Sequence, residues 1–248
     1  MSFAFVYLDD ILVASATPAD HKKHLKELFA LLDVNGININ RKKCTFGQEE
    51  VRYLGHLVNA DGIRPLPARI DDLLQFPAPE SKLGVQRFLG MINYYRRFMP
   101  RIAETLAPLH AAVTSAGKSK QIVWNGECEE AFASAKARLS KAVLLHHPNP
   151  FSATSLTVDA SEVAVGAELS QRGPSGQWRP LAFFSHTLTS TEKKYSAFDR
   201  ELLAIYLSVR NFKHFLEGKP FIIFTDHKPL TYAPVSYTHL TLPTNREV

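Results

Sequence analysis

Two adjacent carboxylates, Asp9 and Asp10, interrupt a β-rich apolar stretch at the start of the sequence. Neighbouring carboxylates repel each other, and a bound divalent cation offsets that repulsion. Phosphoryl and nucleotidyl transfer use such carboxylates to hold two metal ions about 3.5–4 Å apart. Aspartate is also common in solvated turns. The pair alone therefore leaves a metal site and an ordinary acidic turn both open.

A second set of carboxylates consists of Asp159, Glu201 and Asp226. Asp159 and Asp226 each end a predicted apolar strand, whereas Glu201 borders the apolar stripe of a predicted helix, three residues after Phe198. Burying a carboxylate is costly unless it is paired or bound to a metal. The spacing is compatible with one metal site built from three elements. It is also compatible with a Glu201 that pairs with a neighbouring base and aspartates that merely end strands.

Basic and aromatic residues also recur in the first half of the chain. Arg41-Lys42-Lys43 forms one run, and a later region interleaves tyrosines with arginines at Arg87, Tyr94, Tyr95, Arg96, Arg97 and Arg101. This mixture suits binding to a nucleic-acid backbone, although a basic run is most often a solvated loop. The histidine pairs lack the partners that a zinc site needs.

The elements that must position these residues follow from caps, breakers and periodicity. Residues 3–14 predict two buried strands joined at the acidic pair. Thr17-Pro18 predicts a helix start, with an apolar face formed by Leu25, Leu28, Phe29 and Leu32 and an end near Asn35-Gly36. Residues 51–58 predict one strand of a hairpin that turns at residues 59–62.

The second half predicts a helical region followed by an α/β module. Residues 82–116 and 127–142 have helical patterns, with breaks expected at Pro100 and Pro108. Residues 155–171, 178–184 and 221–224 predict strands of a mixed sheet. Between them, Thr189 and Glu192 form a capping-box pair, followed by a six-turn apolar stripe. Its members are Tyr195, Phe198, Leu202, Ile205, Val209, Phe212 and Leu216.

Composition limits the class of protein. The 248 residues are 45% apolar and 21% charged, which is ordinary globular composition. No apolar run of about 18 residues exists, which argues against a membrane-spanning helix, and residues 1–10 do not form a signal peptide. Two cysteines exclude a disulfide scaffold. The net charge of +5 permits a polyanionic partner without requiring one.

Several motifs in one order resemble the reverse transcriptase–ribonuclease H region of gypsy-class LTR retrotransposon Pol polyproteins. Tyr7-Leu8-Asp9-Asp10 resembles the YxDD segment of reverse transcriptases, and Tyr53-Leu54-Gly55-His56 resembles the primer-grip hairpin. Residues 83–98 resemble thumb helices. The segments around Asp159, Glu201 and Asp226 resemble the acidic motifs of the ribonuclease H domain, and the match runs from about residue 3 to about residue 232.

The resemblance implies an α/β (α+β) fold and a division of the chain. Residues 1–66 would be a palm segment, 67–120 a thumb-like region, 121–150 a connection, 151–234 a ribonuclease H-like domain with a mixed sheet, and 235–248 a non-native tail. Residues 236–244 follow neither a helical nor a strand pattern. We therefore expect both ends to be cut, and we expect an incomplete ribonuclease H domain.

The resemblance also implies roles for particular residues. Asp9 and Asp10 would bind the polymerase metals and the triphosphate of a dNTP. Tyr7 and the segment Tyr53, Leu54, Gly55 and His56 would lie at the primer end. Arg87, Tyr94, Tyr95, Arg96 and Arg97 would track the duplex. Asp159, Glu201 and Asp226 would hold two Mg²⁺ ions, with Mn²⁺ as a substitute, and hydrolyse RNA in an RNA–DNA hybrid.

The expected function is thus RNA-directed DNA synthesis and hybrid hydrolysis in the parent polyprotein, which would also carry protease and integrase domains. An RNA template and a DNA primer would be its partners, first in cytoplasmic virus-like particles and later in the nucleus. From this chain itself we expect no polymerase activity and weak or no hybrid cleavage. The alternatives are a non-catalytic template–primer-binding module and a decayed element.

Overall fold

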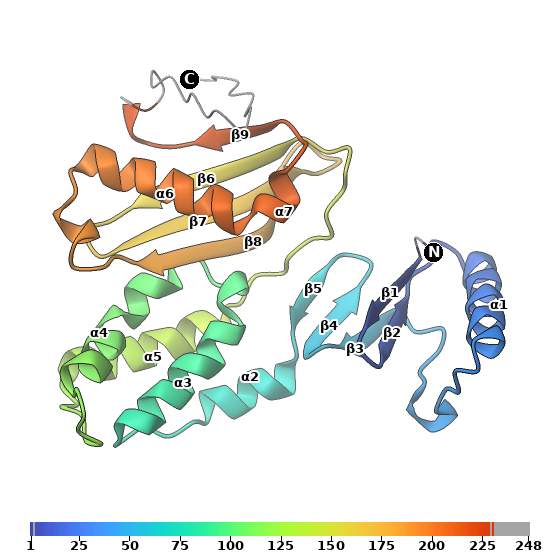
Figure 1. Ribbon diagram of the computed structural model, residues 1–248, viewed down its shortest axis with the longest axis horizontal. Coiled ribbons are helices and arrows are strands. Elements are labelled where there is room, and N and C mark those ends of the chain that lie inside the picture. Colours follow the sequence, from blue (N-terminus) through green and yellow to red (C-terminus); the bar gives the residue numbers. More distant parts are fainter. Residues whose placement is uncertain (2, 229, 231–248) are drawn as a thin grey trace. The chain divides into compact units, whose positions relative to one another are not determined.

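The chain is described by a computed structural model that covers residues 1, 3–228 and 230, and it forms two compact units (Figure 1). The first unit comprises residues 1–60, and the second begins at Asp61. Helices and strands both occur, so the mixed α/β class expected from the sequence is confirmed. The proposed tail, residues 235–248, lies outside the described residues. None of the helices in the described residues has the length and apolarity that crossing a bilayer requires.

The first unit begins with the acidic hairpin. Strands β1 (Ala4–Tyr7) and β2 (Asp10–Val13) pair antiparallel, with Tyr7 opposite Asp10 and a left-handed Leu8 (φ 51°) in the turn. The hairpin is confirmed, but its expected burial is wrong, since Val6 and Leu8 are 67% and 84% exposed. The described residues pack too little against these strands to cover them.

Helix α1 (Pro18–Val34) follows with the predicted ends. The Thr17 side chain accepts a hydrogen bond from the Asp20 backbone N–H, and Pro18 occupies the first turn, where a missing N–H costs nothing. The helix ends at Asn35, before Gly36 with a φ of 67°. Leu28 is buried, whereas Phe29 on the same predicted face is 38% exposed.

The second hairpin turns earlier than predicted. Strands β3 (Glu50–Tyr53) and β4 (His56–Asn59) pair antiparallel, with Tyr53 opposite His56. The chain reverses at Leu54 and Gly55, whose φ angles are 46° and 73°. Two consecutive left-handed residues make the two-residue turn that matches strand twist. The expectation of one strand over residues 51–58 is therefore wrong.

The second unit contains a helical layer. A short strand, β5 (Ile63–Pro65), precedes this layer. The helices of the layer are α2 (Pro67–Leu74), α3 (Lys82–Tyr94), α4 (Ile102–Ser115) and α5 (Gly126–Ser140). The break near Pro100 is confirmed, but Pro108 lies inside α4, so the break expected there is wrong. Buried Leu106 and Leu109 flank it, and their packing outweighs the roughly 3 kcal/mol that proline costs in a helix.

The second unit also contains a four-stranded mixed sheet, and a mixed sheet is what the sequence predicted. Its strands are β6 (Thr154–Ala160), β7 (Ala164–Arg172), β8 (Trp178–Thr187) and β9 (Phe221–Phe224). They lie in the order β8-β7-β6-β9, and β9 is parallel to β6 while the other pairs are antiparallel. The carboxyl ends of β6 and β9 therefore meet at the same end of the sheet.

The predicted six-turn helix is instead two helices, α6 (Ala197–Asn211) and α7 (Lys213–Leu216). The capping box of Thr189 and Glu192 forms, but it opens a single 3-10 turn at Glu192–Lys194. Helix α6 has its own cap, because the Ser196 side chain accepts a hydrogen bond from the Asp199 N–H.

The predicted apolar stripe is confirmed only in its later part: Phe212 and Leu216 are buried, and Ile205 and Val209 pack partly buried against the same core. Ala204 and Ser208 are fully buried, whereas Phe198 and Leu202 of the predicted stripe are 37% and 39% exposed. Small side chains let the helix backbone approach the sheet closely, so the packing selects Ala204 and Ser208 over larger neighbours. Glu201 lies in line with them and is buried rather than at the border.

Helices α6 and α7 lie across one face of the sheet (Figure 1). Helix α4 of the helical layer packs against β8 and β7. The N–H of Ala103 in α4 donates to the Ser185 hydroxyl of β8 across a distance of 3.1 Å. The helical layer is therefore attached to the sheet by a specific polar contact as well as by apolar packing.

Candidate functional site

Three carboxylates from three elements meet at the carboxyl end of β6. Asp159 lies near the end of β6, Asp226 follows β9, and Glu201 lies in α6; one oxygen atom of each lies within 4.8 Å of the others. The parallel register places Thr157 opposite Phe224, and each aspartate lies two residues further along its chain segment. Register and helix packing thus bring together the set that the sequence proposed.

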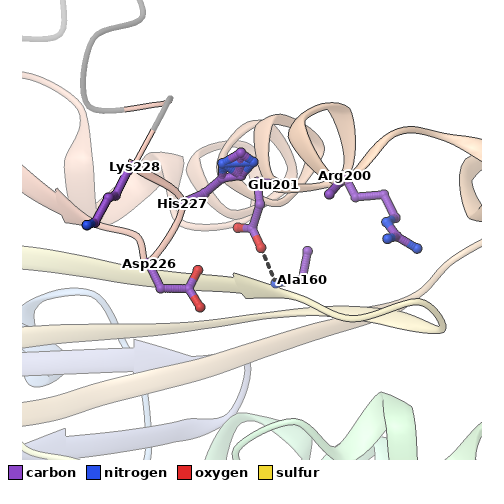
Figure 2. A pocket seen from close by; sticks show the side chains of 7 residues that line it. Ala160, Arg200, Glu201, Asp226, His227 and Lys228 are labelled. Carbon is purple, nitrogen blue, oxygen red and sulfur yellow. Dashed lines mark hydrogen bonds between the residues drawn. The ribbon is translucent and has the colours of Figure 1, made fainter.

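Glu201 is the buried member of the set, with 7% exposure. Its Oε1 accepts a hydrogen bond from the Ala160 N–H at 3.2 Å (Figure 2). Its Oε2 is buried and has no hydrogen-bond partner among the described residues. An orphaned buried carboxylate oxygen is costly unless a cation or a donor satisfies it.

The electrostatics of the site oppose a charged Glu201 in the absence of a cation. Burial raises the pKa of the Glu201 carboxyl above its ordinary value of 4.5 and is the largest influence. The Ala160 hydrogen bond acts against this, the charges of Asp226 and Asp159 raise the pKa further, and His227 lowers it. An all-oxygen donor set is what hard divalent cations such as Mg²⁺ prefer. The residues present therefore fit a divalent metal.

An open pocket of about 320 Å³ borders the carboxylates and has basic walls. Glu201 and Asp226 line it together with Arg200, His227 and Lys228. Figure 2 shows Lys228 and Arg200 on opposite sides of the two acids. The sequence reasoning assigned no role to these three basic residues, although Arg200 precedes Glu201 and His227 and Lys228 directly follow Asp226 in the sequence. Basic side chains beside a metal-binding cluster suit a phosphodiester.

The Asp9–Asp10 pair belongs to the first unit and is a separate candidate site. Asp9 lies in the hairpin turn and Asp10 opens β2, and both are exposed. Among the described residues, no third acidic, histidine or cysteine side chain completes a metal-binding group with them. Tyr7 is 56% exposed beside them.

The predicted primer-grip residues lie close to the acidic hairpin within the first unit. The Tyr53 hydroxyl donates to the Phe5 carbonyl of β1 at 3.4 Å. Partial burial, and then the charge of Asp10, raise the pKa of Tyr53. Leu54 and Gly55 form the adjoining turn, and His56 opens β4. Local folding therefore places this segment next to the YxDD-like residues.

The proposed duplex-tracking residues divide into two groups. Arg87, Tyr94 and Arg97 are exposed, whereas Tyr95 is 6% exposed and packs in the helical core. Arg96 donates to the Ser185 carbonyl, and its guanidinium lies 5.9 Å from the centre of the Phe184 ring. Burial lowers the pKa of Arg96. Tyr95 and Arg96 thus have structural contacts of their own.

Comparison with known proteins assigns the class of the two units. Residues 1–58 match the family described as reverse transcriptase (RNA-dependent DNA polymerase). Residues 124–223 match the family described as the RNase H-like domain found in reverse transcriptase. The fold and the carboxylate site thus define a reverse transcriptase segment followed by a ribonuclease H-like domain.

Curated relatives identify the kind of reverse transcriptase. The chain is 36% identical over 227 residues to the retrovirus-related Pol polyprotein from transposon 297 of Drosophila melanogaster, covering 92% of the chain and 21% of the relative. It is 33% identical over 231 residues to the transposon Tf2-3 polyprotein of Schizosaccharomyces pombe, covering 92% and 17%. The chain belongs to the reverse transcriptase–ribonuclease H region of Ty3/gypsy-type retrotransposon Pol polyproteins. It spans about a fifth of the length of these relatives.

Solved structures show the same fold. The foamy viral protease-reverse transcriptase dRH in complex with ds DNA has a TM-score of 0.82 at 23% identity, covering 94% of this chain and 41% of that one. The foamy viral protease-reverse transcriptase in complex with RNA/DNA hybrid has a TM-score of 0.79 at 23% identity, covering 93% and 31%. The predicted fold and family are confirmed, while the domain boundaries and the residue roles stay predictions.

Proposed function

We propose that Asp159, Glu201 and Asp226 hold divalent metal, Mg²⁺ or Mn²⁺, and that this site hydrolyses the RNA strand of an RNA–DNA hybrid during retrotransposon reverse transcription. The observation that carries the proposal is the meeting of three carboxylates around the buried, unpartnered Oε2 of Glu201. A metal bound there would activate water and offset the charge that develops on the phosphate.

The residues around the cluster have separate tasks in this proposal. Asp226 is exposed at the pocket and is accessible to a substrate phosphate, while Glu201 holds the buried side of the metal site. Arg200 and Lys228 would attract the negatively charged nucleic-acid backbone. The net charge of +5 favours the same attraction. RNA would be distinguished from DNA through contacts with its 2′-hydroxyl groups.

The first unit receives the complementary role in the parent polyprotein. Asp9 and Asp10 would bind the polymerase metals and the triphosphate of a dNTP, and Tyr7 with the Tyr53–His56 turn would lie at the primer end. The contact from Tyr53 to β1 supports this grouping. Template, primer, protease and integrase would then be partners within cytoplasmic particles, before the DNA product reaches the nucleus.

Hybrid cleavage tests the assignment of the metal site. Incubation of the chain and a hybrid labelled in its RNA strand with Mg²⁺ or Mn²⁺ is expected to give weak, metal-dependent cleavage. Asp159→Asn is expected to lower the rate about a hundredfold or more, because metal ligation supplies several kcal/mol of transition-state stabilisation.

The matched control is Glu162→Gln, which removes one negative charge from the exposed loop just beyond Asp159. This variant is expected to cleave as the parent chain does. Equal cleavage and equal metal binding by Asp159→Asn and the parent chain would contradict the assignment.

A further inference from the structure

One cationic side chain from the helical layer contacts the carboxylate site at Asp159. Arg101 forms an ion pair with Asp159, between its Nη2 and the Asp159 Oδ2. Its side chain is 60% exposed and that of Asp159 is 35% exposed, so the pair lies at the edge of the site and within reach of solvent. Arg101 immediately precedes α4, which packs against β8 and β7, whereas Glu201 lies in α6. The cation therefore reaches Asp159 from a different layer than Glu201 does.

The backbone of Arg101 is held in an uncommon conformation. Its φ and ψ are 50° and 31°, in the left-handed region that non-glycine residues rarely adopt. Such a conformation persists where the surroundings fix it. Here the next turn is tied to β8, because the Ala103 N–H donates to the Ser185 hydroxyl and the Thr187 hydroxyl donates to the Ala103 carbonyl at 3.4 Å. The attachment of α4 thus directs the Arg101 side chain.

A glycine on the sheet makes room for that side chain. Gly166 of β7 is paired with Asp159 of β6 in the antiparallel register. A Cβ atom added at Gly166 would lie 3.3 Å from Cγ of Arg101, closer than an ordinary van der Waals contact. The aliphatic part of Arg101 therefore lies over Gly166 on its way to Asp159. The position of the Arg101 side chain is thus fixed by its own backbone conformation, by the space at Gly166 and by the Asp159 carboxylate.

The consequence concerns metal loading. Three carboxylates with oxygens within 4.8 Å of one another repel, and the Arg101 guanidinium offsets that repulsion when no metal is bound. A divalent cation needs the Asp159 carboxylate that the guanidinium contacts, and two cations at one carboxylate repel each other. We propose that Arg101 is an internal counter-cation that competes with divalent metal for Asp159, so that the seating of the helical layer on the sheet sets the metal affinity of the ribonuclease H-like site.

Metal binding without substrate tests this inference, which rests on the proposed function. Binding of Mn²⁺ alone to the full chain is measured by water-proton relaxation at constant pH and low salt. Arg101→Gln is expected to bind Mn²⁺ about three- to fivefold more tightly than the parent chain, the range of a solvent-accessible ion pair. Gly166→Ala is expected to shift affinity in the same direction by less, because it displaces the arginine by a few tenths of an ångström. The difference should shrink in high salt.

The matched control is Arg210→Gln, which removes an equal charge from an exposed position nine residues beyond Glu201, about 13 Å along α6. Its affinity should equal that of the parent chain. Unchanged or weaker Mn²⁺ binding by Arg101→Gln would overturn the role of Arg101, provided that Asp159→Asn abolishes binding. If Asp159→Asn binds Mn²⁺ as the parent chain does, the proposed function fails as well.

Discussion

Glu201→Gln is expected to stabilise the metal-free chain while removing its metal binding and hybrid cleavage. Glutamine keeps the oxygen that accepts the Ala160 N–H, and it removes a charge that burial and two neighbouring aspartates disfavour. The expected gain is about 0.5–2 kcal/mol near neutral pH, and the expected loss of cleavage is about a hundredfold or more. Thermal unfolding without metal measures the first, and the labelled hybrid measures the second.

The pH dependence of this gain has a definite sign. The pKa of Glu201 is raised in the folded chain, so the favourable contribution of its protonated form is present below about 4.5 and is lost as the pH rises through the folded-state value. The Glu201→Gln variant has no carboxyl group at this position, so its stability does not fall in this way as the pH rises. The difference in melting temperature should therefore be small near pH 4 and should grow as the pH rises.

In the presence of metal, the parent chain should become more stable than the Glu201→Gln variant. Saturating Mg²⁺ stabilises a chain that binds it, and the variant has lost a ligand. The control is Glu217→Gln, an exposed change at the end of α7. It should alter the free energy of unfolding by no more than about 0.5 kcal/mol, both without and with Mg²⁺. A metal-free Glu201→Gln chain that is less stable than the parent at every pH would contradict this account of the site.

Phe88→Ala is expected to cost about 3–5 kcal/mol of the free energy of unfolding of the second unit. Phe88 is fully buried in α3, and its ring centre lies 4.5 Å from that of Phe132 and 5.9 Å from that of Phe76. Truncation to alanine leaves a cavity at the centre of the helical layer. Urea unfolding monitored by tryptophan fluorescence measures the loss, since Trp124 packs against the same cluster.

Leu83→Ala is the matched control, because Leu83 lies in the same helix and is 69% exposed. Its effect should stay within about 0.5 kcal/mol. Equal losses from the two variants would show that the helical layer is not packed around Phe88. Arg101 belongs to the same layer. Loosening the layer by Phe88→Ala should therefore weaken the ion pair between Arg101 and Asp159.

Much of the local structure could be predicted from short sequence signals. Thr17 with Pro18 starts α1, Asn35-Gly36 ends it, and the succession of strands and helix along residues 155–224 follows from apolar runs and turns. These signals act within a few residues, through caps, φ preferences and period. They failed where two local options compete. Leu54-Gly55 made an earlier turn than the predicted one, and Ser196 capped α6 in place of the Thr189–Glu192 box.

The candidate site was likewise determined partly by the sequence and partly by the tertiary structure. The sequence by itself determined which carboxylates are candidates, because Asp159, Glu201 and Asp226 end or border apolar elements, and the motif order indicated the family. Only the tertiary structure decided that these acids meet, that Glu201 is buried with a free Oε2 within the described chain, and that Tyr95 packs inside. It alone placed Arg101 on Asp159. That contact joins residues far apart in the chain and depends on how a helical layer seats on a sheet, whereas sequence patterns report the preferences of neighbouring residues.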